Sequence, residues 1–223
     1  MKKLTFYEQV GIVIPGSVLL FGLFFFFPLL KELLAKDGVS VGQLGIFVLL
    51  SYAAGHLIAA FGNAGEGLLW SLAGGMPSDW VIKKETSLLS PLQREQLPKK
   101  ISSRLGITIA SVIGLERKSW FPVSRQLYID VARHGKPDRL DTFNGNYGLN
   151  RGLAAACIIL AFVAFADGQK HVGFGLMILT AIYVYRAYRF GIHYGRELYL
   201  QFLSMSDAPG KPPKAKKAHA AKS

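Results

Sequence analysis

Three polar side chains interrupt an otherwise apolar stretch of this chain: His56, Asn63 and Glu66. Their spacing places them on one face of a helix, if a helix that begins near Val41 continues to Trp70. Ionisable groups at membrane depth are costly, and they often mark functional sites. This stripe could form hydrogen bonds between helices, with the glutamate paired to an arginine. It could instead line a path for an ion or proton built by several subunits, or act as an acid/base site.

An acid/base site needs a nucleophile or a second carboxylate, and Asp79 is the one neighbour that the sequence offers. His56, Glu66 and Asp79 are therefore the candidate catalytic groups. No HExxH or paired-cysteine spacing predicts a metal site, and no P-loop, GxGxxG or GxSxG pattern is present, so no cofactor is expected. The single cysteine, Cys157, lies in an apolar run; it excludes an intrachain disulfide and is predicted to be buried.

A second constellation of charged side chains lies towards the C-terminus, among many tyrosines. Its members share one helical face by their spacing of three, four and three residues: Arg186, Arg189, His193 and Arg196. Such a face is typical of an interfacial belt, with aromatic rings at head-group depth and guanidinium groups among anionic lipid phosphates. Alternatively it binds an acidic ligand or partner, because arginine holds phosphate bidentately. Arg151 could contribute to this face or pair with Glu66.

Four apolar segments must position these groups: about 10–30, 41–62, 149–166 and 172–190. The first, Val10–Leu30, holds 21 uncharged residues, enough for a helix to cross a hydrocarbon core of about 30 Å. A signal peptide is the alternative, but the run exceeds a typical signal segment and no clear cleavage site follows it. The last two segments are separated by a tight turn at Asp167–Lys170 and predict a helical hairpin, either spanning or re-entrant.

The second apolar segment is rich in glycine and alanine, for example at Gly55 and Gly62. Small residues let another helix approach closely. We therefore expect this helix to pack against others, with the stripe of His56, Asn63 and Glu66 facing into the bundle.

The basic residues predict the topology. The net charge is +12, from 26 Lys and Arg against 14 Asp and Glu. Only Lys31, Lys36 and Lys170 fall in or beside the two short loops on one side of the predicted bundle. Because basic residues stay on the cytoplasmic side during insertion, both termini and the long middle segment are predicted to be cytoplasmic, in a bacterial-type inner membrane.

The predicted fold class is therefore an all-α membrane protein with four transmembrane helices. Its parts are an N-terminal helix pair (1–67), a small, mostly helical cytoplasmic insert (68–148), a C-terminal helix pair (149–206) and a basic tail (207–223). The tail is rich in lysine, proline and alanine, a composition typical of disorder and of attraction to anionic lipids.

Local signals in the insert predict its turns and helices. The run Gly74-Gly75-Met76-Pro77 predicts a turn at its start. Ser90 and Pro91 are typical of a helix start, followed by an apolar stripe and by Pro98, which should kink or divide the helix. The stripe consists of Leu92, Leu97, Ile101 and Leu105. Residues 107–113 favour a strand or a buried helix turn. Residues 120–122 predict an apolar anchor and a break, and 124–133 a helix closed by Gly135, with Leu127, Ile129 and Val131 partly buried.

Two functional hypotheses fit these observations. The favoured one is a non-enzymatic membrane protein that assembles with itself or with a cytoplasmic protein partner, as a scaffold, a pore or a membrane effector such as those of phage defence. The alternative is a membrane-embedded enzyme acting on a lipid or isoprenoid-phosphate substrate. The lipid bilayer and its anionic lipids are expected partners in both. Nucleic acid is not, because charges of both signs alternate in the insert.

Overall fold

The computed structural model describes residues 9–29, Glu32 and 41–207, except for the side chains of Gln9 and Pro137. Within this part of the chain the fold is all-helical, as predicted, with no strand. Its α-helices are α2 (Ile14–Phe26), α4 (Val41–Leu72), α5 (Pro91–Leu105), α6 (Arg117–His134), α7 (Pro137–Ala166) and α8 (Lys170–Ser204). A π-helical turn, η1 (Gln9–Val13), precedes α2, and a 3-10 helix, η2 (Pro77–Ile82), follows α4.

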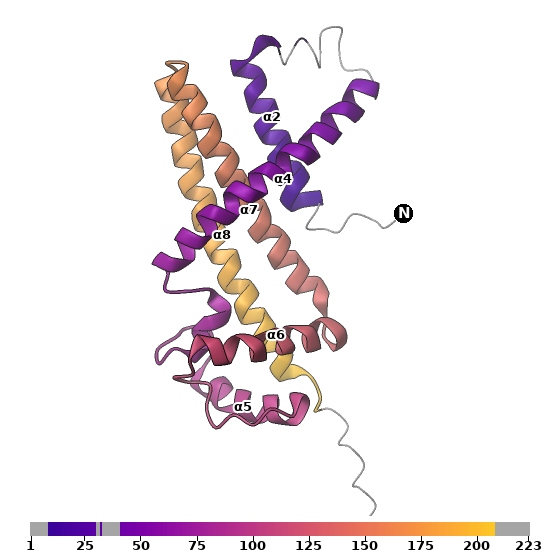
Figure 1. Cartoon of the computed structure of the whole chain (residues 1–223), viewed down its shortest axis with the longest axis vertical. Helices are drawn as coiled ribbons and strands as arrows, with labels where there is room; N and C mark the ends of the chain where they lie inside the picture. Colours follow the sequence, from indigo (N-terminus) through magenta and orange to yellow (C-terminus); the bar gives the residue numbers. More distant parts are fainter. Residues whose placement is uncertain (1–8, 30–31, 33–40, 208–223) are drawn as a thin grey trace, which may run out of the picture.

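The long antiparallel pair α7 and α8 forms the axis of the molecule (Figure 1). Their connection at 167–169 is the predicted tight turn, with Gly168 at φ +79°, a conformation that favours glycine. Close to the turn, a Cβ at Gly173 would lie 2.5 Å from the Phe165 ring, so glycine is required there for the two helices to approach. The two helices therefore form an antiparallel hairpin, in which α7 begins at Pro137 rather than near residue 149.

A close crossing joins α2 to α4 (Figure 1). A Cβ at Gly16 would lie 1.9 Å from the carbonyl oxygen of Ser51, and one at Gly55 would lie 2.2 Å from that of Ile12. The backbones themselves are therefore in contact, as the small residues of this segment predict. At Gly62 a Cβ would lie 3.2 Å from the Arg151 side chain of α7.

The first apolar segment differs from the prediction of one helix over Val10–Leu30. It begins as a π-helical turn, and α2 ends at Phe26. Phe27 is extended (φ −123°, ψ 89°), and the physical reason is the following Pro28, which disfavours helical geometry in the residue before it.

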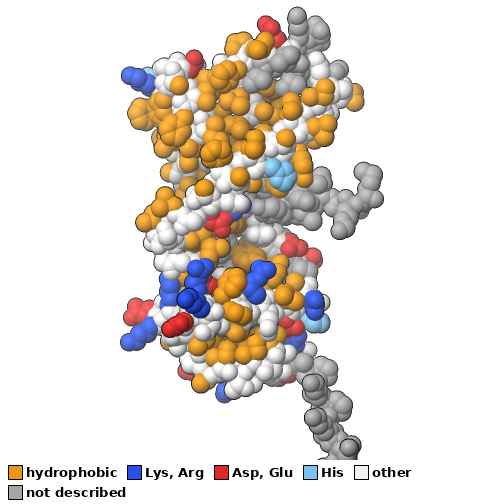
Figure 2. All heavy atoms as spheres, viewed as in Figure 1, with side chains coloured by type: hydrophobic (Ala, Val, Ile, Leu, Met, Phe, Trp, Pro, Cys, Tyr) orange, Lys and Arg blue, Asp and Glu red, His pale blue; other side chains and the backbone are white. Residues whose placement is uncertain are grey.

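Two helices, α4 and α7, are long and apolar enough to cross a membrane by length and composition. The other two predicted membrane segments do not meet these criteria, since α2 is shorter and α8 carries more polar side chains. Figure 2 shows hydrophobic side chains covering most of the upper half of one face, whereas most visible Lys and Arg lie in the lower half. Lys31, Lys36 and residues 208–223 of the basic tail lie outside the described residues.

The insert packs against the C-terminal half of α8, far from the 167–169 turn (Figure 1). Its fully buried side chains include Trp120, Leu127 and Val131 of α6 and Leu97 and Ile101 of α5. They share one core with Leu198, Tyr199 and Phe202 of α8. The insert and this end of α8 therefore form a single packing unit.

Helix α5 begins as predicted. Ser90 is its N-cap, its hydroxyl accepts from the Gln93 amide N–H, and the Gln93 side chain accepts from the Ser90 N–H. This reciprocal pair is a capping box. The helix is not divided at Pro98, which is buried within Pro91–Leu105. Leu92 is exposed, unlike Leu97 and Ile101, so the predicted stripe is wrong at its first position.

Two further local predictions are wrong. Residues 107–113 form neither a strand nor a helix turn but an irregular segment, in which Val112 contributes a buried side chain to the insert core. Helix α6 begins at Arg117 and continues through Pro122, although a proline at this sixth position removes one intrahelical hydrogen bond. Its end at Gly135 is as predicted, but Ile129 is exposed.

Candidate functional site

The polar stripe on α4 does not face the bundle as a unit. His56 and Asn63 are exposed, and only Glu66 is half-buried. The inward face of α4 is instead formed by Ser51, Gly55, Ile58, Gly62 and Trp70. This face packs inward because its glycines permit close backbone contact. A helix turns 100° per residue, so His56 points away from the face that holds Gly55.

Glu66 accepts a hydrogen bond from Arg151 of α7, which confirms the pairing weighed from the sequence. Both side chains are largely buried, with 19% and 15% of their surfaces exposed. The Arg151 guanidinium also lies 5.4 Å from the centre of the Tyr147 ring. The pair links α4 to α7, and removing one partner would leave the other charge largely buried and unpaired.

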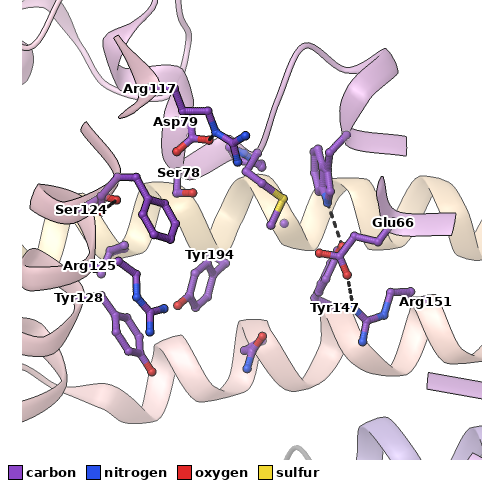
Figure 3. A pocket seen from close by; sticks show the side chains of 17 residues that line it. Glu66, Ser78, Asp79, Arg117, Ser124, Arg125, Tyr128, Tyr147, Arg151 and Tyr194 are labelled. Carbon is purple, nitrogen blue, oxygen red and sulfur yellow. Dashed lines mark hydrogen bonds and ion pairs between the residues drawn. The ribbon is translucent and has the colours of Figure 1, made fainter. Parts of the chain in front are cut away.

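A central pocket of about 390 Å³ opens beside this ion pair (Figure 3). Its lining residues come from α4, η2, α6, α7 and α8. The charged ones are Glu66, Asp79, Arg117, Arg125 and Arg151. In Figure 3, Glu66, Tyr147 and Arg151 lie at one end, and Arg125, Tyr128 and Tyr194 at the other.

The turn after α4 brings Asp79 to this pocket. Gly74 and Gly75 have φ of +78° and +104°, so the predicted Gly-Gly turn uses conformations that other residues rarely adopt. The following η2 segment is fixed by its Ser78 carbonyl, which accepts from the Tyr199 hydroxyl and from the Trp120 indole at 3.3 Å. Asp79 is buried and accepts from Arg117 Nε at 2.8 Å.

Trp70 forms the wall between α4 and the α7–α8 pair. Its indole N–H donates to the Tyr147 hydroxyl at 2.9 Å, and its ring stacks on Tyr188 with 5.6 Å between centres. A Cβ at Gly191 of α8 would lie 2.6 Å from the Trp70 ring. The absence of a side chain on α8 therefore makes room for the tryptophan, and the tryptophan fixes the α4 end that carries Glu66.

The Glu66–Arg151 pair borders two further pockets. A side pocket of about 850 Å³ is also lined by Asn63, Asp79 and Arg117. An apolar pocket of about 340 Å³ shares Glu66, Tyr147 and Arg151 with the central pocket. Its remaining lining is almost entirely hydrocarbon, from residues that include Leu68, Leu69, Leu72, Ala154, Ile158 and Val184. One ion pair thus marks the border between polar and apolar surface.

The predicted arginine face of α8 lies outside the central pocket and makes internal contacts. Arg186 donates to the Asn150 side chain at 3.1 Å, and Arg189 to the Tyr185 hydroxyl at 3.2 Å. Arg196 donates to the carbonyls of Ser87 and Leu88, which join η2 to α5.

His193 stacks on Phe143 with 5.7 Å between ring centres. Burial lowers the pKa of the His193 imidazole, and the neighbouring Arg189 and Arg196 lower it further. Of the residues predicted to bind an anion, Arg151 alone lines the central pocket.

Several pocket residues were missed by sequence reasoning: Arg117, Arg125, Tyr128, Asn144 and Tyr194. A partial signal exists for α6, where Phe121, Ser124, Arg125 and Tyr128 follow helical spacing on one face. Asn144 and Tyr194 lie fifty residues apart on other helices, so their convergence depends on tertiary packing.

The described residues of the site do not form a set of metal ligands. In the part of the chain that the structure describes, no three His, Cys, Asp or Glu side chains gather closely enough to hold a metal ion. Glu66 and Asp79 each pair with an arginine, and His56 lies outside all three pockets around the pair. The arrangement suits binding of a polar group next to an apolar one.

Comparison with known proteins gives no indication of a function. No family model, no curated protein and no solved structure matches this chain.

Proposed function

We propose that this chain is a multi-pass membrane protein that binds an amphiphilic ligand, such as a lipid, at the Glu66–Arg151 pair. The observation that carries the proposal is the shared border of two pockets. Glu66, Tyr147 and Arg151 line both the central pocket, which holds charged side chains, and the apolar pocket. A ligand with a polar head and a hydrocarbon tail matches both surfaces, because ligand sites combine apolar walls with a few placed polar groups.

Membrane insertion of all four predicted segments is part of this proposal. Large side chains of α4, including Leu49, Leu57 and Phe61, are 67–71% exposed, and only 17% of its most apolar stretch is buried within the protein. Hydrocarbon contact stabilises such a surface, whereas water does not. With α8 paired along α7, four segments place both termini and the insert on the cytoplasmic side of a bacterial-type inner membrane, in agreement with the basic residues.

Binding is favoured over catalysis by the state of the two carboxylates. Glu66 accepts from Arg151, and Asp79 accepts from Arg117. Each carboxylate is therefore already engaged in an ion pair between two elements of the fold. The membrane-enzyme alternative would need one of these pairs to open when substrate arrives.

The test fills the apolar pocket without disturbing the fold. Gly65 lines this pocket, and a Cβ there would meet no atom within 4 Å. Gly65→Leu should therefore fold normally but block the ligand tail, lowering the amount of lipid that co-purifies by about tenfold, as for a loss of about 1.4 kcal/mol. Native mass spectrometry of the detergent-purified full chain measures the bound lipid.

Gly45→Leu is the matched control, since Gly45 lies on the same helix with nothing within 4 Å of a Cβ and outside all three pockets. Equal lipid retention by the wild type, Gly65→Leu and Gly45→Leu would contradict the proposed ligand site.

A second candidate function, assembly into a scaffold or pore, is favoured by His56. This imidazole is exposed on the apolar face of α4, with its ring 4.6 Å from Tyr52. A polar group facing hydrocarbon is costly, and a second copy of the chain packed along α4 would remove it from lipid. Such an assembly agrees with an effector or scaffold role, with the insert available to a cytoplasmic protein.

A further inference from the structure

We infer that the ligand of the central pocket is an anionic phospholipid with a single negative phosphodiester, held by Arg125. This inference rests on the proposed function, because it names the chemistry of the amphiphile's head. It adds a specific residue at the end of the pocket opposite the Glu66–Arg151 pair (Figure 3).

The arginines that line the central pocket outnumber its carboxylates by one. Arg151 is paired with Glu66, and Arg117 with Asp79. Arg125 is the third arginine of the lining, and no carboxylate of the described residues lies within ion-pair distance of it. A ligand with one negative charge would therefore balance the charged side chains that line the pocket.

The polar side chains around Arg125 can donate hydrogen bonds to a ligand, and those of Arg125, Tyr128 and Asn144 are exposed. In Figure 3, Tyr128 and Tyr194 flank its guanidinium, which lies 5.8 Å from the centre of the Tyr128 ring. Asn144 lines the same pocket, and the structure gives none of these four side chains a hydrogen bond to a described residue. Burial raises the pKa of the Tyr194 hydroxyl to about 12, so it remains a donor at neutral pH. Phosphate oxygens are the complementary acceptors.

The distance between the two ends of the pocket suits a phospholipid. Asn144 and Arg151 lie seven residues apart on α7, which is about 10 Å along the helix axis. The apolar pocket begins at Arg151. A tail in the apolar pocket and a phosphate at Arg125 therefore leave the region of the Glu66–Arg151 pair for the glycerol and ester groups.

The experiment compares lipids of different charge. The full chain is purified in detergent, delipidated and titrated with short-chain phosphatidylglycerol, phosphatidylcholine or soluble glycerol phosphate, with native mass spectrometry as the readout. The wild type should bind phosphatidylglycerol most tightly. Arg125→Gln should bind it about tenfold more weakly, since a charge-assisted hydrogen bond is lost.

Arg133→Gln is the matched control, because Arg133 is exposed on the same helix and lines none of the described pockets. It should bind phosphatidylglycerol like the wild type.

The other outcomes separate this inference from the function on which it rests. The inference is overturned if the wild type binds phosphatidylcholine as tightly as phosphatidylglycerol, or if Arg125→Gln binds phosphatidylglycerol like the wild type. In either case the Gly65→Leu variant still tests the proposed amphiphile site. Tight binding of glycerol phosphate alone overturns a lipid as the source of the phosphate. Loss of binding in Gly65→Leu together with an unchanged Arg125→Gln overturns the role of Arg125 alone.

Discussion

Ion pairs between helices hold the polar side of this molecule in place, and each joins elements that are distant in the sequence. Glu66–Arg151 joins α4 to α7, and Asp79–Arg117 joins η2 to α6. Arg104 donates to Asp130 through Nε at 2.7 Å and through a second nitrogen at 3.1 Å, which joins α5 to α6. Asp130 is on the same helix as Arg125, so this pair helps to fix the helix that carries the proposed phosphate contact.

Asp130 predicts a specific dependence of stability on pH. The hydrogen bond from Arg104 lowers the pKa of the Asp130 carboxyl, and His134 lowers it further. Because the folded pKa is below the unfolded one, the stabilisation is present above the unfolded pKa and lost as the pH falls through the folded pKa. At pH 7, Asp130→Asn should cost about 1.5 kcal/mol and lower the apparent melting temperature by about 3 to 6 °C.

Thermal unfolding in detergent at pH 7 and pH 3 measures this effect. The difference from the wild type should shrink at pH 3, and Glu95→Gln, an exposed carboxylate on α5, should change little at either pH. A constant difference at both values would show that the ion pair is not its source.

Helix α8 contacts two different parts of the molecule. Its N-terminal half packs on α7 near the apolar end of the molecule, and its C-terminal half supplies Tyr199 and Phe202 to the insert core. At 35 residues it is about 52 Å long, which exceeds a hydrocarbon core of about 30 Å. The insert and the apolar end of the molecule are therefore connected by one continuous helix.

The exposed face of α4 is where self-assembly is tested. If a second copy packs there, a His56→Cys variant should form disulfide-linked dimers in oxidised membranes. Phe162→Cys, on an equally apolar and 70% exposed position of α7, should not. Gel electrophoresis without reductant measures the dimer fraction, and equal crosslinking of the two variants would argue against a specific α4 interface.

At this scale the sequence predicts the helices well, and their partners less well. Apolar length and the Gly-Gly, Ser-Pro and Asp-Gly signals locate α4, α5 and the α7–α8 turn, because these depend on local backbone chemistry. The break at Phe27 and the orientation of His56 were not predicted. Both are decided by contacts and neighbours outside the hydrophobic pattern, namely Pro28 and the glycine face of α4.

The candidate site was predictable only in part for a related reason. Glu66 and Arg151 stand out as charges beside apolar segments, and their pairing follows from that setting. Arg125, Tyr128 and Tyr194 look like ordinary surface residues of the insert and of α8. Only the packing of α6 against α8 brings them to one pocket, and no spacing rule describes such a convergence.

At the scale of the whole molecule, the charged central pocket and the apolar pocket meet at one ion pair. Figure 2 shows one face that is mostly apolar in its upper half and carries most of its visible charges in its lower half. A lipid bound at this border would have its tail beside α4 and α7 and its head against the insert. Its presence would then be communicated to the insert through α6 and η2, which both line the central pocket.

Photocrosslinking with a lipid that carries a reactive group near the end of its acyl chain tests this arrangement directly. Mass spectrometry of the crosslinked full chain in membranes should find the label concentrated on the apolar pocket, at Leu68, Leu69 and Ala154. Labelling spread evenly over exposed apolar positions such as Leu49 and Phe162, with no excess at the pocket, would contradict a ligand site at the Glu66–Arg151 pair.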